Sequence, residues 1–309
     1  MSTPTTSRRR RRRGFARTAF PIRRCVRRIT NLKRRAFIGG AAAAVATVGA
    51  APAWPFAGTL AIYAQRLHDD EPFAVHDASV ALPAASVIKL VILVGIEREI
   101  DAGRATWHET LSLLSREIVG ASETFGTARA GSRATIRRLA VAMIDQSDNT
   151  AANALADRLS FEGVNAVAAS LGLAKTRLRR HFMDFAARAR GIDNTTSAAD
   201  MGRLLLGIER GARSMPQRVA GASSCRDMVE IMLRQEDRVT IPDGIARRVP
   251  IANKTGVLPG VRNDVAIVDP FGSAPYVVAM LSTFPAQMEL LAYAQLRATA
   301  GRIDRLARA

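Results

Sequence analysis

Residues 249–281 read VPIANKTGVLPGVRNDVAIVDPFGSAPYVVAML and contain three short apolar runs, at Val249–Lys254, Val265–Val268 and Tyr276–Leu281. Runs of this length that are rich in β-branched residues and bounded by Pro, Gly and Asp are typical of β-strands. From about Gln287 to Leu306 the apolar residues recur with the spacing of an amphipathic helix. The end of the chain is therefore predicted to form three strands of a sheet followed by a terminal helix.

Outward from this stretch, two more strands are predicted near the start of the chain, at Thr59–Ala64 and Phe73–His76, with a turn between them. The intervening segment has mostly helical spacing and begins with a strongly apolar helix from Ser86 to about Asp101. Gly191–Ser197 interrupts the helical pattern as a loop. Strands that enclose a helical block predict an α+β domain, with an α/β part at 54–85 plus 240–309 and an all-α part at 86–239.

The positive charge is concentrated at the start of the chain. Residues 1–53 hold fourteen of the 45 lysines and arginines and no acid, so only +4 of the net charge of +18 belongs to the rest. Lys33-Arg34-Arg35-Ala36-Phe37 precedes an Ala/Gly-rich run that ends in Ala51-Pro52-Ala53, as in a twin-arginine export signal with a basic extension. A membrane anchor is the alternative, but a run so poor in Leu, Ile and Phe inserts weakly. We expect cleavage after Ala53, export to the periplasm and no stable membrane insertion.

The composition excludes several classes of protein. With 48% hydrophobic and 23% charged residues, the chain is neither disordered nor a multi-spanning membrane protein. Cys25 would leave with the signal, so Cys225 has no partner for an internal disulfide. The four histidines lack the short spacings of zinc ligands, and we expect neither a metal nor a cofactor. Because the excess of positive charge lies in residues 1–53, nucleic acid is not an expected partner, although polyanion binding by that arm remains an alternative of another class.

Three short motifs follow one another along the chain: Ser86-Val87-Ile88-Lys89 opens the apolar helix, Ser147-Asp148-Asn149 lies between two helices, and Lys254-Thr255-Gly256 ends a strand. Residues i and i+3 share one face of a helix, so the amine of Lys89 can lie beside the Ser86 hydroxyl. A lysine buried among apolar groups has a lowered pKa and can act as the base that a serine nucleophile needs. Ser86 alone could equally be an N-cap, but the three motifs in this order favour a nucleophile.

Lysine is scarce in this chain, which has 41 Arg and four Lys. Of the three lysines beyond residue 53, Lys89 and Lys254 fall within the motifs, and only Lys175 lies elsewhere. Arginine cannot lose its proton in a protein, whereas lysine can. The retention of lysine at these two positions therefore points to proton transfer rather than to charge alone.

With these motifs the sequence resembles the penicilloyl-serine transferase superfamily, and most closely the class A β-lactamases. The resemblance covers nearly all of residues 54–309 and includes the longer match Ser147–Asn153. It implies a β-lactamase/transpeptidase-like fold, in which a five-stranded antiparallel sheet is flanked by helices and accompanied by an all-α subdomain. The active site would lie between the sheet and the helical block.

The resemblance also implies roles for individual residues. Ser86 would be the acylated nucleophile, Lys89 its base, and Ser147 the group that passes a proton to the leaving nitrogen. The backbone N–H groups of Ser86 and Val257 would form the oxyanion hole. The residues expected to bind the substrate are Asn149, Lys254, Thr255, Gly256, Val257 and Arg262.

Two parts of a class A site have no firm position in this sequence. Class A enzymes carry a Glu that activates the deacylating water, in a loop before an Asx-Thr-Thr turn, but residues 181–196 contain no Glu. At equal loop length the position falls on His181, and the nearest carboxylate is Asp184, whose alternative role is to cap a helix or pair with an arginine. Arg262 is the candidate for the arginine that steadies a substrate carboxylate, with an ordinary surface arginine as the alternative.

The sequence thus predicts an exported, monomeric serine β-lactamase that acts through an acyl-serine, in antibiotic resistance or β-lactam catabolism. Because the loop Glu is missing, we expect acylation to be faster than deacylation. The alternatives on the same fold are a D-Ala-D-Ala-type peptidase that acts on cell-wall peptides, an esterase, a penicillin-binding protein of slow turnover, and a sensor that is acylated and stops.

Overall fold

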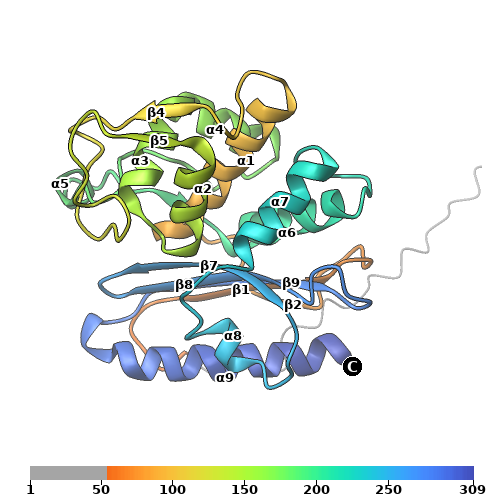
Figure 1. Cartoon of the computed structure of the whole chain (residues 1–309). Coiled ribbons are helices and arrows are strands. Elements are labelled where there is room, and N and C mark those ends of the chain that lie inside the picture. Colours follow the sequence, from red (N-terminus) through yellow and green to blue (C-terminus); the bar gives the residue numbers. More distant parts are fainter. Residues whose placement is uncertain (1–53) are drawn as a thin grey trace, which may run out of the picture. The chain divides into compact units, whose positions relative to one another are not determined.

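The computed structural model describes residues 54–309, and a five-stranded antiparallel sheet runs through this part of the chain (Figure 1). The strand order is β2-β1-β9-β8-β7, so the first and last strands of the sequence pair in the middle of the sheet. The predictions for residues 1–53, the export signal among them, lie outside the described residues. The strands are β1 (Leu60–Arg66), β2 (Ala74–His76), β7 (Ile251–Leu258), β8 (Val261–Val268) and β9 (Tyr276–Ser282).

The central strands of the sheet are buried along their whole length. β1 pairs with β9 from Leu60↔Ser282 to Arg66↔Tyr276, and every residue of β8 and β9 is buried. A strand with one solvated face would alternate between exposed and buried residues, whereas these strands are covered on both faces, and even the polar residues Arg262, Asn263 and Asp264 of β8 are buried. Helices cover both faces of this sheet (Figure 1).

Two hydrophobic cores lie on the two faces of the sheet. Along β1, Leu60 and Ile62 point into one core and Ala61 and Tyr63 into the other, as the two-residue period of a strand requires. The smaller core is closed by the C-terminal helix α9 (Glu289–Arg308) and the short α8 (Ile241–Gly244), which run along one face in Figure 1. The larger core lies between the other face and the helical block.

The helical block is built around α1 (Lys89–Asp101), whose residues from Lys89 to Glu97 are all buried. It also contains two small two-stranded sheets, β3-β6 and β4-β5. The other elements are η1 (Ala85–Ile88), β3 (Leu82–Pro83), β4 (Thr110–Ser112), β5 (Arg133–Thr135), α2 (Ile136–Asp145), α3 (Asn149–Leu159), α4 (Phe161–Ser170), α5 (Phe185–Ala189), β6 (Thr195–Thr196), α6 (Ala198–Ala212), α7 (Ala222–Met232) and η2 (Ala286–Met288).

The local differences from the predicted elements have simple causes. The helix expected from Ser86 begins as the 3-10 turn η1, and α2 begins at Ile136 because Thr135 caps it by accepting from the Arg138 backbone N–H. The paired segments β3-β6 and β4-β5 were missed because two- and three-residue strands leave no periodic signal. In the described residues, none of the helices has the length and apolar character needed to cross a membrane.

Candidate active site

The first motif lies where the sheet meets the helical block. Ser86 is in η1, directly before α1, and Ala85 precedes it with a left-handed φ of 46°, so the chain turns sharply at the serine. Gly256 of β7 packs against this turn: a Cβ there would lie 2.9 Å from the Ser86 backbone nitrogen. Only glycine allows β7 to approach so closely, and this approach brings the first and third motifs together.

The amine of Lys89 is fully buried and points at the second motif. It donates hydrogen bonds to the Ser147 carbonyl oxygen at 2.6 Å, to Asn149 Oδ1 at 2.8 Å and to Ser147 Oγ at 3.2 Å. Burial, and then the charge of Lys254, hold the pKa of Lys89 well below its ordinary value. Lys89 is thus suited to accept a proton, and its hydrogen bonds are to Ser147 and Asn149 rather than to Ser86.

Ser147 stands between two lysines. It has a left-handed φ of 59° between α2 and α3, and its Oγ accepts from Lys89 and, at 3.0 Å, from Lys254 Nζ. Burial lowers the pKa of Lys254 to about 7. Asp148 fixes the turn, because its carboxylate caps α3 at the Ala151 N–H and accepts from two backbone N–H groups of the 124–125 segment.

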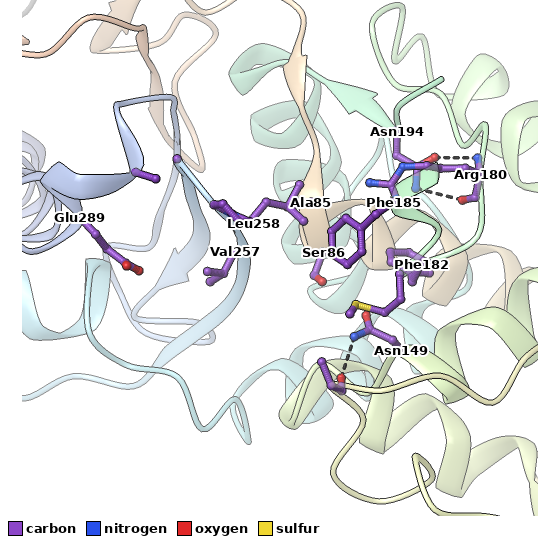
Figure 2. A pocket seen from close by; sticks show the side chains of 15 residues that line it. Ala85, Ser86, Asn149, Arg180, Phe182, Phe185, Asn194, Val257, Leu258 and Glu289 are labelled. Atoms are coloured by element: carbon purple, nitrogen blue, oxygen red, sulfur yellow. Dashed lines mark hydrogen bonds between the residues drawn. The ribbon is translucent and has the colours of Figure 1, made fainter. Parts of the chain in front are cut away.

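The amide of Asn149 is engaged at both ends. Its oxygen accepts from Lys89, and its Nδ2 donates to the Ala121 carbonyl at 2.7 Å, the bond drawn beside Asn149 in Figure 2. In this arrangement Asn149 orients the lysine amine. The side chain also lines the cleft, as expected for a group near the substrate.

The cleft has two lobes that share Ser86, Ala121, Asn149 and Val257. The first, here named the loop lobe, is a cavity of about 440 Å³ (Figure 2). It is mostly apolar and is walled by Phe182, Met183 and Phe185 on one side and residues 257–260 on the other. The second, here named the acidic lobe, is a cavity of about 290 Å³ whose lining includes Ser147, Thr255 and the carboxylates of Glu123, Asp145, Glu236 and Asp237.

Phe182 is the residue of the loop that faces Lys89. Its ring centroid lies 4.7 Å from Lys89 Nζ, and its backbone is clamped by Asn153, which accepts from the Phe182 N–H at 2.8 Å and donates to its carbonyl at 3.4 Å. Phe182 was missed by the sequence analysis, which looked for a carboxylate. Asn153 was visible as the last residue of the extended second motif, but its partner lies 29 residues away.

His181 and Asp184 each have a partner within the helical block. The His181 ring pairs with Asp157 of α3 at 2.7 Å. The Asp184 carboxylate caps α5 by accepting from the Ala187 N–H at 2.9 Å, and Asp184 is not among the residues that line the loop lobe. Its alternative role, shaping the loop, therefore accounts for its contacts.

Arg262 is also placed differently from either expectation. It is only 2% exposed, so it is not a surface arginine. Its Nη1 and Nη2 donate to the two carboxylate oxygens of Asp237 at 2.7 and 2.8 Å. Although burial raises the pKa of Asp237, the hydrogen bonds from Arg262, together with its charge and the Thr255 hydroxyl, bring that pKa below its ordinary value.

This fold and the arrangement of the three motifs are those of a protein of the β-lactamase type. The chain matches the Beta-lactamase enzyme family over residues 44–308, and it belongs to that family. The five-stranded sheet with its flanking helices confirms the predicted fold.

Several relatives are known by name. The chain is 31% identical over 215 residues to β-lactamase AST-1 of Nocardia asteroides, a match covering 67% of this chain and 66% of the relative. It is 29% identical to a β-lactamase of Kitasatospora aureofaciens, covering 65% of each chain. The chain thus spans just under two thirds of the length of these two relatives.

Several solved structures are similar to this chain over a larger part of its length. The structure of PBP-A superposes with a TM-score of 0.73 at 28% identity, covering 82% of this chain and 91% of PBP-A. A mutant of PBP-A, described as an acyl-enzyme complex with penicillin G, gives a TM-score of 0.72 at 28% identity, covering 80% and 89%. A β-lactamase of Sphaerobacter thermophilus gives a TM-score of 0.69 at 25% identity, covering 84% and 93%.

Proposed function

We propose that this protein opens β-lactams by forming an acyl ester on Ser86 and releases the acyl group slowly. The observation that carries the proposal is the hydrogen-bonded series from Lys89 through Ser147 to Lys254, with both lysines buried and both pKa values lowered. Ser147, in the middle of this series, lines the acidic lobe, as Ser86 does.

The contacts of Lys89 define a path for the proton. A neutral amine has two N–H groups, and the carbonyl oxygens of Ser147 and Asn149 can only accept, so they take both. The lone pair is then left toward Ser147 Oγ, 3.2 Å away. When Ser86 attacks the lactam carbonyl, its proton is proposed to reach Lys89 by way of the Ser147 hydroxyl, and Ser147 then returns a proton to the nitrogen that leaves.

The backbone around Ser86 supplies the electrostatic part of the mechanism. The N–H groups of Ser86 and Val257 are proposed to receive the oxyanion, as in the family that the sequence resembles. Lys254 and Thr255 border the same cleft from β7, and Gly256 holds β7 against the serine turn. Substrate binding by these three residues remains part of the proposal.

Slow deacylation is proposed because the loop offers no base for the water. The position beside Lys89 holds the ring of Phe182, residues 181–196 contain no Glu, and the Asp184 carboxylate caps its own helix. A water that must attack the ester then lacks a positioned group to deprotonate it, and a displacement of about 1 Å alone can cost roughly a hundredfold in rate.

The same feature favours a second candidate function. An enzyme that holds β-lactams as long-lived esters behaves as a penicillin-binding protein whose ordinary substrate is another amide or ester, such as a D-Ala-D-Ala-type cell-wall peptide. The similarity to PBP-A supports this candidate. Either substrate lies outside the cytoplasm, which agrees with the export that we propose from residues 33–53.

Mass spectrometry of the intact protein with penicillin G tests the proposal. The wild-type chain is expected to gain the mass of one penicillin, Ser86→Ala to gain none, and the exposed Ser223→Ala to label as the wild type does. Labelling that survives in Ser86→Ala would show that the nucleophile lies elsewhere.

A further inference from the structure

One face of α3 carries three side chains that bind other parts of the molecule. Asn149, Asn153 and Asp157 are spaced four residues apart, so they lie along the same face of the helix. The amide oxygen of Asn149 accepts from the Lys89 amine. Asn153 clamps the backbone of Phe182, and the Phe182 ring lies over that amine. Two successive turns of α3 therefore hold the lysine and the ring that covers it.

Asp157, on the next turn of α3, holds the residue that directly precedes Phe182. Its Oδ1 lies 2.7 Å from His181 Nε2. A carboxylate can only accept, so Nε2 carries a proton and donates it, whether the ring is neutral or charged. The Phe161 ring contacts the imidazole edge on, with centroids 4.9 Å apart, and the His181 carbonyl accepts from Arg180 at 3.1 Å. Both the side chain and the backbone of His181 are thus fixed.

The charged groups around Asp157 favour its ionised form. Arg116 Nε donates to Asp157 Oδ2 at 3.1 Å. Although burial raises the pKa of Asp157, its hydrogen bonds and charge interactions with His181 and Arg116 bring that pKa below its ordinary value. Glu117 also faces this carboxylate, and burial, and then the hydrogen bond and charge of Asp157, raise the pKa of Glu117. The acceptor of His181 is therefore a carboxylate, and the hydrogen bond is charge-assisted.

The segment around Phe182 has no helix or strand to hold it. Residues 181–184 lie outside both, and Met183 has a left-handed φ of 67°, so the chain turns directly after Phe182. The position of such a backbone depends on the groups that bind it. Asn153 accepts from the Phe182 N–H at 2.8 Å, but its bond to the Phe182 carbonyl is long, at 3.4 Å. The side chain of His181 supplies a second fixed point, one residue away.

We propose that His181 is a positioning residue: its hydrogen bond to Asp157 keeps the ring of Phe182 over the amine that acts as the base. This inference rests on the proposed acylation of Ser86 with Lys89 as that base. It assigns to the loop a part in acylation that does not depend on a carboxylate.

The pKa of Lys89 reports whether the ring is in place. Burial is the main cause of its lowered pKa, the charge of Lys254 lowers it further, and Asp148 raises it. His181 is not one of these charged groups. A substitution of His181 therefore leaves both charges where they are and changes the pKa of Lys89 through the cover that Phe182 provides.

The pH profile of acylation by penicillin G, followed by mass spectrometry of quenched samples, tests the proposal. His181→Ala and Asp157→Ala should each move the acidic limb upward by at least about half a pH unit, or about threefold in rate at a fixed pH on that limb. His181→Gln keeps an N–H that can donate to Asp157 and should retain the wild-type limb. The His181 side chain is 31% exposed, so its replacement is expected to leave the chain folded, and Asp157→Ala tests the same pair from α3.

Two controls and a double variant show by which route His181 acts. His108→Ala removes an exposed histidine elsewhere in the helical block, and Arg116→Ala removes the other partner of Asp157. Both should keep the wild-type limb, because an exposed ion pair contributes little. The double variant His181→Ala/Phe182→Ala should move the limb no further than Phe182→Ala alone, because residues that act through one contact are not additive.

The outcomes separate this inference from the proposed function. An acidic limb that moves in neither His181→Ala nor Asp157→Ala overturns the positioning role while acylation of Ser86 stands. A limb that moves as far in His181→Gln or Arg116→Ala as in His181→Ala overturns it as well, and so do shifts that add in the double variant. Failure of penicillin G to acylate Ser86 in the wild-type chain overturns the proposed function, and this inference with it.

Discussion

The ring of Phe182 lies over the amine of Lys89, with its centroid 4.7 Å from Nζ, and Asn153 holds the backbone of Phe182 in that place. The ring covers one side of the buried amine, and burial is the main cause of the lowered pKa of Lys89. Under the proposed function a low pKa of Lys89 favours acylation, and the loop that carries Phe182 has no Glu in residues 181–196 to activate the deacylating water.

Lys89→Arg tests whether this side chain acts as a base. The substitution keeps a positive charge but removes a group that can lose its proton. The rate of acylation by penicillin G should fall at least about a hundredfold, which is the usual scale for loss of a general base. The rate is measured by mass spectrometry of samples quenched at successive times. Lys175→Arg, at an exposed position, is the matched control. A loss below about threefold would mean that Lys89 serves as a charge or as packing.

Phe182→Ala should shift the pH dependence of acylation. Burial is the main cause of the low pKa of Lys89, and removal of the ring admits water, so that pKa should rise toward its ordinary value. Since the neutral amine is the active form, the acidic limb of the acylation rate should move to higher pH. Phe185→Ala removes an exposed ring of the same lobe and should leave the limb in place. If the acidic limb of the pH profile does not move in Phe182→Ala, Phe182 does not influence the pKa of Lys89.

Turnover of a chromogenic cephalosporin should begin with a burst equal to the enzyme concentration and continue with a slow steady state. Asp184→Asn should leave the lifetime of the acyl-enzyme unchanged, because the Asp184 carboxylate caps α5 and asparagine can cap it as well. Rapid, linear turnover without a burst would show that deacylation has an efficient base, and a longer lifetime in Asp184→Asn would identify that base as Asp184.

Glu97 should make the protein less stable as the pH rises. It is fully buried on α1, neither carboxylate oxygen has a hydrogen-bond partner, and burial raises its pKa to about 8. Between its ordinary pKa of 4.5 and this value, the folded chain keeps the proton while the unfolded chain loses it. The free energy of unfolding should therefore decrease through this window by up to about 1.4 kcal/mol per pH unit.

Glu97→Gln removes this titration and should flatten the pH dependence, as measured by denaturant unfolding across the window. Glu230→Gln, an exposed carboxylate on α7, is the control and should keep the wild-type slope. Equal slopes for wild type and Glu97→Gln would place the carboxyl of Glu97 in contact with water.

The sequence predicted those parts of the site that depend on residues close together in the chain. The interval from Ser86 to Lys89, the turn at Ser147 and the strand that ends at Gly256 each obey rules that act within a few residues, as do the apolar runs of the strands. The scarcity of lysine singled out Lys89 and Lys254, and the structure buries both amines beside Ser147.

The residue of the loop 181–196 that faces Lys89 could not be predicted in the same way. Counting residues back from Asn194 placed His181 at the critical position, but Asn153 clamps Phe182, one residue further along. Which side chain of an irregular loop faces a site depends on the groups that bind its backbone, and these lie on another helix.

What the sequence by itself determined is the α+β fold and the order of its motifs, because periodicity and short spacing act through neighbouring residues. Only the tertiary structure decided that Phe182 covers Lys89 and that Asp237 takes both Nη groups of Arg262. The physical reason is that both contacts join residues distant in the chain, and burial strengthens the charge and packing effects through which they act.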